Sequence, residues 1–313
     1  MHSETSYRGL TAVAEGSTSQ FTTLFDNATL NQIERMRLRP LRRLTNRSRG
    51  EHLSGKGGSS TDFADYRDYA VGDDLRYVDW NIFARLQRPY IKQFQHEEEM
   101  HVVLLIDAST SMVSGGKLQV AKQAAAAMGI MGLLNVERVS AYAVHGQSDR
   151  PWMFAPGTGR TRIRPLLRFL EDLEGGGSTP VETAIEMMLK FHRGRGVAIL
   201  ISDFLTIGDL NRPMNLLYSS GLEVWGLQVL SEAEINPNVQ GDLRFVDSET
   251  QETLDITNAS ELLNVYHDQR LLLQTSLDAM CRRRQGRFLS VSSGMAFSTL
   301  LFEHLCRQGW VQR

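Results

Sequence analysis

From about residue 99 onwards, apolar runs alternate with stretches in which apolar positions recur at helical spacing. The apolar runs are short and rich in β-branched residues, which is typical of strands buried on both faces of a sheet. They fall at residues 102–106, 139–144, 197–201, 224–230 and 288–292. The helical stretches cover residues 117–135, 160–173, 180–192, 209–220 and 259–285. This alternation predicts an α/β fold with a doubly wound, mainly parallel sheet and right-handed crossovers.

Three shorter patterns add detail to the predicted sheet domain, which spans residues 99–313. The segment PWMFAP, at 151–156, predicts an antiparallel edge strand. An insertion at about 231–258 predicts a β-hairpin with its turn near Ser248–Gln251. Apolar residues near 296–308 predict a final helix that covers the sheet.

The N-terminal part of the chain divides into two stretches of different composition. Residues 1–24 are rich in Ser, Thr and Gly and lack periodicity, so we expect a flexible tail. Residues 25–98 are expected to form a segment that packs on the sheet domain. Within it, residues 29–45 have apolar positions at helical spacing, interrupted by Pro40. The arginines among them would suit phosphate groups, but no aromatic residues for base stacking lie there, which favours a solvated face or an acidic partner.

The composition is that of an ordinary globular protein, with 42% hydrophobic and 22% charged residues. A formal net charge of -2 argues against a chain built mainly to bind nucleic acid. No apolar run approaches the roughly 20 residues that span a bilayer, and the N-terminus lacks the basic and apolar regions of a secretion signal. We therefore expect a cytoplasmic protein without membrane contact, in which Cys281 and Cys306 are reduced thiols.

Acidic and hydroxyl residues stand where two of the apolar runs end. The run VVLLI is followed by DASTSM, which supplies Asp107, Ser109 and Ser111. A second run ends at Asp203, and Thr179 lies in the glycine-rich sequence GGGSTP. Because parallel strands bring their carboxyl ends to one edge of a sheet, these side chains are expected to converge. Carboxylate and hydroxyl oxygens are hard ligands of the kind that Mg²⁺ or Mn²⁺ binds, so the pattern predicts a metal site.

A simpler interpretation is open for each part of this pattern. Asp and Ser are common in turns and helix caps, so the sequence Asp-x-Ser-x-Ser alone is a weak signal. Thr179 is also placed to cap a helix that starts at Pro180, a role compatible with metal binding. A metal-dependent hydrolase is the competing function, but hydrolysis needs a general base or a second metal. The candidate bases His145 and His192 end a predicted strand and a predicted helix, which favours ordinary structural roles.

The five residues resemble the metal-ion-dependent adhesion site of von Willebrand factor A domains, which combines Asp-x-Ser-x-Ser with a distant Thr and a more distant Asp. All five positions match, at Asp107, Ser109, Ser111, Thr179 and Asp203. The resemblance implies a von Willebrand A or Rossmann-like fold in which the three hydroxyls bind the ion. It implies that the two carboxylates act mainly through water or through hydrogen bonds to those hydroxyls. It also implies an open metal position, which an acidic residue of a partner protein fills.

A second motif precedes the sheet domain, in the stretch FADYRDYAVGDDLRYVDWNIFARLQRPYIKQF. It resembles a signature of the bacterial domain-of-unknown-function 58 family. The matching residues are Arg67, Tyr69, Gly72, Asp73, Asp74, Arg76, Asp79, Trp80, Ala84 and Arg85. In a structural interpretation, the acids cap a turn while Tyr77, Trp80 and Phe83 pack on the sheet domain. The alternative is a docking face formed by the arginines and acids.

The two resemblances together imply a function in binding rather than in catalysis. We expect a non-catalytic module that engages other proteins through its divalent metal. Relatives of this kind look like adaptors or chaperone-like partners of MoxR-type AAA+ ATPases, which implies such an ATPase and a client protein as partners. No catalytic residue is predicted.

Overall fold

The computed structural model describes residues 20–41, 45–46, 61–97, 100–144, 152–205, 208–237, 243–246, 253–256 and 262–313. Its largest element is a six-stranded sheet with the strand order β12-β9-β8-β5-β6-β7. The strands are β5 (His101–Asp107), β6 (Arg138–Val144), β7 (Trp152–Gly157), β8 (Gly196–Ser202), β9 (Leu222–Leu230) and β12 (Arg287–Ser292). All neighbouring pairs are parallel except β6 and β7, which are antiparallel. The α/β class, the mainly parallel sheet and the antiparallel edge strand are therefore confirmed.

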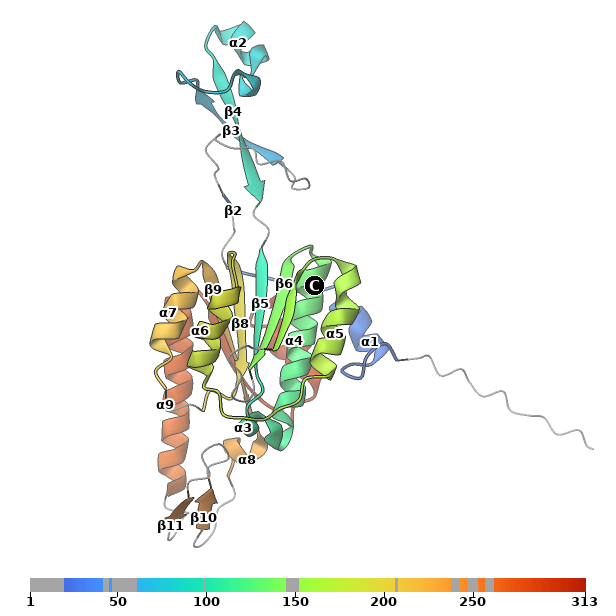
Figure 1. Cartoon of the computed structure of the whole chain (residues 1–313), viewed down its shortest axis with the longest axis vertical. Coiled ribbons are helices and arrows are strands. Elements are labelled where there is room, and N and C mark those ends of the chain that lie inside the picture. Colours follow the sequence, from blue (N-terminus) through green and yellow to red (C-terminus); the bar gives the residue numbers. More distant parts are fainter. Residues whose placement is uncertain are drawn as a thin grey trace, which may run out of the picture.

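Alternate residues of the central strand β5 feed two separate hydrophobic cores, because successive side chains of a strand point to opposite faces. Val102, Leu104 and Ile106 pack with α4 (Lys117–Leu134) and α5 (Ile163–Glu171). Val103 and Leu105 pack with α6 (Val181–Phe191), α7 (Asn211–Ser219) and α9 (Leu262–Arg283). Figure 1 shows these helices in two layers, one on each side of the sheet. Burial on both faces explains why the strand is apolar throughout.

The N-terminal segment adds two elements to the larger core. Residues Asn27–Ile33 form α1, and Arg37–Leu38 form β1, which pairs antiparallel with β13 (Val311–Gln312). The expected helix over 29–45 is therefore wrong beyond Ile33. The reason is a change of period, since Met36 and Leu38 are buried while Arg37 between them is exposed. Alternation of this kind suits a strand, and the C-terminal strand supplies its hydrogen bonds.

A smaller sheet lies outside the main one, with the order β2-β4-β3 and antiparallel pairing. It consists of β2 (Thr45–Asn46), β3 (Thr61–Asp68) and β4 (Tyr90–Glu97), with η1 (Leu75–Tyr77) and α2 (Trp80–Leu86) between β3 and β4. Figure 1 shows it beyond the N-terminal end of β5, away from the main sheet. Trp80 is 57% exposed and its ring contacts Phe83, so it does not pack on the sheet domain as expected. The division of the chain into residues 1–24, 25–98 and 99–313 stays a prediction.

The remaining elements connect the strands of the main sheet or follow its last strand. Short helical turns α3 (Thr110–Val113) and η2 (Ser114–Gly116) follow β5, while η3 (Arg160–Arg162) precedes α5. After β9 come α8 (Glu232–Ile235) and an antiparallel pair, β10 (Leu243–Val246) with β11 (Thr253–Ile256), where a hairpin was expected. The turn predicted at 248–251 lies outside the described residues. The final helical stretch is α10 (Phe297–Thr299) followed by the π-helical turn η5 (Leu300–Leu305).

Two further observations concern the whole described part of the chain. None of its helices combines the length and the apolar character needed to cross a bilayer. Both cysteines are free thiols, and burial raises the pKa of Cys281 to about 12. Cys281 therefore acts as an apolar core residue rather than as a reactive thiol.

Candidate functional site

The residues of the predicted metal site lie at the carboxyl ends of two neighbouring strands. Asp107 is the last residue of β5, and Asp203 directly follows β8, which pairs with β5. Ser109 precedes α3 and Ser111 lies within it. Thr179 stands just before α6, in the loop after α5. The topology thus brings the backbone positions of all five to one edge of the sheet.

Backbone hydrogen bonds join the loop that carries Thr179 to the end of β5. The Thr110 N–H donates to the Gly177 carbonyl over 2.9 Å, and the Thr110 hydroxyl donates to the same oxygen over 3.0 Å. The Gly176 N–H donates to the Ala108 carbonyl over 2.7 Å. As a result, Thr179 and Asp107 line the same small pocket.

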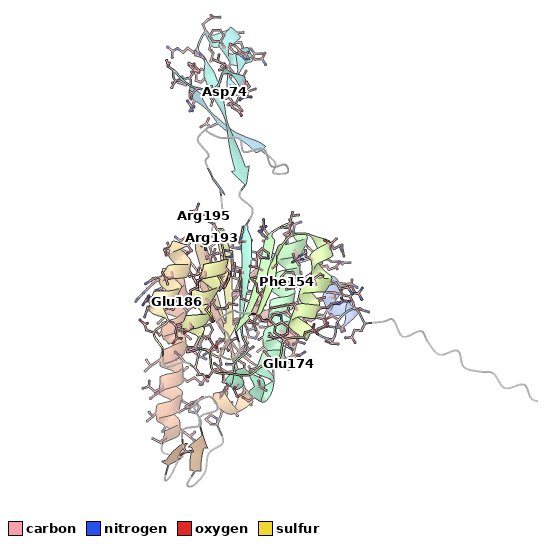
Figure 2. All side chains as sticks on the ribbon, viewed as in Figure 1. Asp74, Phe154, Glu174, Glu186, Arg193 and Arg195 are labelled. Atoms are coloured by element: carbon pink, nitrogen blue, oxygen red, sulfur yellow. The ribbon has the colours of Figure 1, made fainter. Side chains whose placement is uncertain are left out.

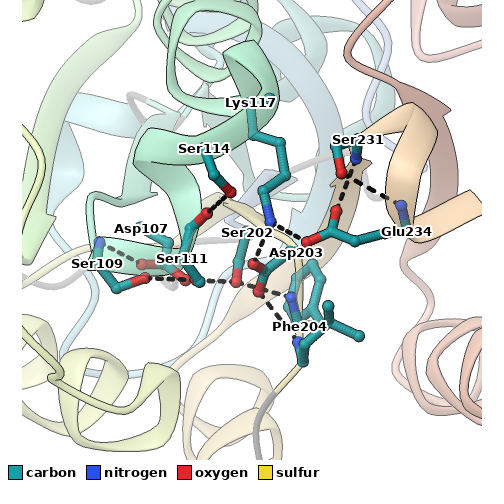
Figure 3. Close-up of polar contacts among 12 residues, drawn as sticks. Asp107, Ser109, Ser111, Ser114, Lys117, Ser202, Asp203, Phe204, Ser231 and Glu234 are labelled. Carbon is teal, nitrogen blue, oxygen red and sulfur yellow. Dashed lines mark hydrogen bonds and ion pairs between the residues drawn. The ribbon is translucent and has the colours of Figure 1, made fainter. Parts of the chain in front are cut away.

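Hydrogen bonds hold the Asp107 carboxylate in a fixed orientation (Figure 3). Its Oδ1 accepts from the backbone N–H of Ser109 over 2.9 Å, and its Oδ2 accepts from the hydroxyl of Ser202 over 2.6 Å. Burial raises the pKa of Asp107, an effect that these hydrogen bonds oppose and the nearby Asp203 charge reinforces. A buried carboxylate with a raised pKa gains most from a cation placed beside it. Ser202 ends an apolar run as Asp107 does, but it was not predicted to belong to this site.

The two serines of the motif present their hydroxyls to each other. Ser109 Oγ and Ser111 Oγ are 3.0 Å apart, and Ser109 is 3% exposed. Ser111 is additionally fixed through its backbone, since its carbonyl accepts from the Ser114 hydroxyl over 2.9 Å. Together these contacts place two hydroxyl oxygens next to the Asp107 carboxylate, as Figure 3 shows.

Lys117 is a further residue of this site that the sequence did not indicate, as is its partner Glu234. Lys117 begins α4, its side chain is completely buried, and its Nζ donates to Asp203 Oδ2 over 2.8 Å and to Glu234 Oε1 over 2.5 Å. Burial acts to lower the pKa of Lys117, but the two carboxylates outweigh it and the pKa is raised. Lys117 is therefore a charged ammonium. The only signal in the sequence was a lysine at the start of a largely apolar helix.

Glu234 is held on α8 by contacts of its own. Ser231 and Glu234 form a capping box, in which Glu234 Oε2 accepts from the Ser231 N–H over 2.7 Å. The Glu234 carbonyl accepts from the Tyr266 hydroxyl on α9 over 2.6 Å. Gly115 lies against Ser231, where a Cβ atom would come within 2.5 Å of the serine Cβ. Lys117 and Glu234 therefore link the site to α8 and, through Tyr266, to α9.

The chemistry of these side chains fits a hard divalent cation. Three carboxylates and one ammonium give the cluster of Asp107, Asp203, Glu234 and Lys117 a formal charge of -2. Within the described residues, no group of three or more His, Cys, Asp or Glu side chains is arranged to hold a metal. A cation here would accordingly depend on the hydroxyls of Ser109, Ser111 and Thr179, which are ligands suited to Mg²⁺ or Mn²⁺.

Of the two candidate catalytic histidines, His192 does not join this site. His192 follows α6, and its ring packs edge-on against His101, which begins β5. Figure 2 shows Arg193, the next residue, at the opposite end of the sheet from Glu174, which belongs to the loop of Thr179. His145 lies outside the part of the chain that the structure describes.

The polar residues of the N-terminal motif pair with one another. Arg67 makes two hydrogen bonds of 2.6 Å to Asp73, and Arg76 forms an ion pair with Asp74. The hydrogen bond from Arg67 lowers the pKa of Asp73 to about 2. Asp79 caps α2 by accepting from the backbone N–H groups of residues 81 and 82. These contacts favour the structural interpretation of the motif's acids.

Comparison with protein families finds a match to the model described as "Protein of unknown function DUF58", over residues 65–271. Uncharacterized proteins from Mycobacterium bovis and Mycobacterium tuberculosis are 28% identical to the chain over 208 residues. That alignment covers 64% of this chain and 65% of the relatives' own length.

Among solved structures, BatB from Bacteroides thetaiotaomicron is 15% identical, with a TM-score of 0.41 over 66% of this chain and 98% of that one. An aerotolerance-related membrane protein from Bacteroides fragilis is 16% identical, with a TM-score of 0.39 over 64% of this chain and 96% of that one. Scores this low carry no argument about function.

Proposed function

The chain belongs to the DUF58 family of proteins of unknown function, and on that premise we propose that it is a non-catalytic interaction module that engages other proteins through a divalent metal. The observation that carries the proposal is the convergence of Asp107, Ser109 and Ser111 at the carboxyl end of β5, with Asp203 on the neighbouring strand exit. These residues match the metal-ion-dependent adhesion site of von Willebrand factor A domains.

The roles of the side chains follow from their contacts. Ser109 and Ser111 offer hydroxyl oxygens 3.0 Å apart, and Thr179 stands in the loop whose Gly177 carbonyl accepts from the Thr110 N–H. Asp107 is held by the Ser109 N–H and by Ser202, so its orientation does not depend on a metal. A bound Mg²⁺ or Mn²⁺ supplies positive charge at this edge, which attracts a carboxylate of a partner protein.

Binding explains this arrangement better than hydrolysis does. Metal-assisted hydrolysis needs a general base near the ion or a second metal. Of the two histidines considered, His192 lies at the far end of the sheet. In the described part of the chain no group of three or more His, Cys, Asp or Glu side chains is arranged to hold an additional metal ion.

The partner that we propose is a MoxR-type AAA+ ATPase, with the chain as an adaptor or chaperone-like factor in the maturation of a client protein in the cytoplasm. This partner comes from the resemblance of the motifs alone. A metal-bridged contact suits an adaptor because it is polar and reversible, and it is broken when the metal is removed.

The test measures metal binding first and partner binding second. Titration calorimetry with Mg²⁺ and Mn²⁺ compares the wild type with Ser109→Ala/Ser111→Ala and with the control Ser219→Ala, whose exposed hydroxyl donates to the Leu216 carbonyl at the end of α7. We expect binding to the wild type and to the control, and none to the double variant. The same proteins are then tested for association with the ATPase in Mg²⁺ and in EDTA. Equal association in all cases would reject a metal-bridged contact.

A further inference from the structure

A lysine ammonium lies inside the candidate metal site. The Lys117 side chain has no exposed surface, and its Nζ is 2.8 Å from Asp203 Oδ2 and 2.5 Å from Glu234 Oε1. Figure 3 shows Lys117 pointing from α4 to these two carboxylates, next to the cluster of Asp107, Ser109 and Ser111. The ammonium therefore already neutralises part of the negative charge that would attract a cation.

The contacts of Asp203 are divided between Lys117 and the backbone. Its Oδ2 accepts from Lys117, its Oδ1 accepts from the Leu205 N–H over 3.1 Å, and its own carbonyl accepts from Gln228 Nε2 over 2.8 Å. Asp203 is 3% exposed, so water screens the Lys117 charge weakly. A divalent ion near Asp203 would experience repulsion from this ammonium.

Glu234 has the opposite effect, because it adds a negative charge on the far side of the same ammonium. Its Oε2 is occupied by the Ser231 N–H and its Oε1 by Lys117. It stands on α8, outside the five residues of the motif. Glu234 and Lys117 thus form an ion pair that adjoins the predicted ligand Asp203 and lies outside the motif.

We propose that Lys117 is a tethered counter-cation that limits the affinity of this site for divalent metals, and that Glu234 sets how strongly it does so. This inference rests on the proposed function, since it concerns the same site. Lys117 lowers the affinity for the metal through its charge, while Glu234 raises it. A site adjusted in this way binds metal weakly by itself and gains from a partner carboxylate that completes the coordination.

A purely structural role for Lys117 makes a different prediction. If the ion pairs only fasten α4 to α8, their removal lowers the stability of the protein, and metal binding stays equal or becomes weaker as the site loosens. The charge mechanism instead requires a change of affinity whose sign follows the charge that is removed.

The experiment is a series of variants that differ in the charge of the site. The series comprises Lys117→Met, Glu234→Gln, the two combined, and Lys122→Met as a control on the same helix. Mn²⁺ affinity is measured by electron paramagnetic resonance, with Mg²⁺ as competitor, and folding is checked by circular dichroism and thermal unfolding. Lys117→Met should bind Mn²⁺ about tenfold more tightly or better, because a nearby positive charge in a poorly solvated site is gone. Glu234→Gln should bind it about tenfold more weakly.

The double variant and the control complete the test. The double variant has the formal charge of the wild type, so its affinity should return to within about threefold of the wild-type value, and Lys122→Met should not change it. A folded Lys117→Met protein with equal or weaker Mn²⁺ binding would overturn the inference. Should Lys117→Met fail to fold, an unchanged affinity in folded Glu234→Gln would overturn it equally.

The outcomes also separate this inference from the proposed function. Wild-type binding that is lost in Ser109→Ala/Ser111→Ala but insensitive to both charges would refute the role of Lys117 and leave the metal site standing. Metal binding by Lys117→Met but not by the wild type would overturn the proposed metal-dependent function, while supporting the inhibitory effect of the Lys117 charge. An absence of metal binding in every folded variant would overturn both.

Discussion

Replacing His192 should remove a large part of the protein's sensitivity to mild acid. His192 is 4% exposed, its Nε2 lies 3.1 Å from the Gly194 carbonyl, and its ring packs on His101. Its Nδ1 is buried and has no hydrogen-bond partner among the described residues. Burial lowers the pKa of His192 from 6.5 to about 4, so the imidazole is neutral in the folded protein.

The sign of the pH effect follows from this lowered pKa. As the pH falls below 6.5, the unfolded chain takes up a proton on His192 that the folded protein does not accept until about pH 4. Stability is therefore complete above pH 6.5 and is lost progressively between pH 6.5 and pH 4. A shift of this size corresponds to about 3 kcal/mol at most, at about 1.4 kcal/mol for each pH unit.

The assay is urea unfolding of the wild type and of His192→Gln between pH 7.5 and pH 4.5. Carboxylates also titrate in this range, so the informative quantity is the difference between the two proteins. The wild type should lose about 2 to 3 kcal/mol more than the variant on going to pH 4.5. The half-buried His304, replaced in His304→Gln, serves as the control and should follow the wild type. Parallel pH profiles for the wild type and His192→Gln would show that the buried neutral imidazole does not cause the acid sensitivity, and would contradict the structural role given to this histidine.

Two further predictions concern the core and its N-terminal attachment. In Gly132→Ala, the new Cβ would come within 2.8 Å of Val139 Cγ2. The free energy of unfolding in urea should therefore fall by roughly 1 to 3 kcal/mol, although alanine has the better helix propensity. An equal or higher stability would contradict the close packing of α4 on the sheet. Glu223→Ala removes a fully buried carboxylate. This carboxylate accepts from Trp225 Nε1 over 2.7 Å and from the Leu41 N–H over 2.9 Å. That variant should lose about 2 to 4 kcal/mol and exchange the Leu41 amide proton faster, whereas the exposed-site control Glu303→Ala should change neither.

Local patterns were sufficient to predict the main sheet. The runs that became β5, β6, β8 and β9 are apolar because both faces of each strand are covered, and that requirement is visible in the sequence itself. The edge strand β12 differs, because its burial alternates and Ser290 and Ser292 are only half-buried, so the expectation that it is buried on both faces is wrong. Asp107 and Asp203 could be placed at one edge for the same reason, since the direction of parallel strands fixes where they end.

Contacts between distant residues were not predictable in this way. The strand at Arg37–Leu38 depends on pairing with Val311–Gln312 at the other end of the chain. Lys117 acquires its role only from Asp203 and Glu234, which lie 86 and 117 residues further on. Neither partner could be identified from the sequence around the residue. The exposure of Trp80 was not predictable for the same reason, because it depends on where the small sheet lies relative to the main sheet.

We expect one divalent ion to bind among the oxygens of Asp107, Ser109, Ser111, Thr179 and Asp203. The most direct measurement is a crystal structure of the protein grown with Mn²⁺ and recorded at a wavelength where manganese scatters anomalously. We predict an anomalous peak about 2.0 to 2.3 Å from the hydroxyl oxygens of Ser109 and Ser111. Well-ordered density for these side chains without such a peak, at saturating Mn²⁺, would contradict the account.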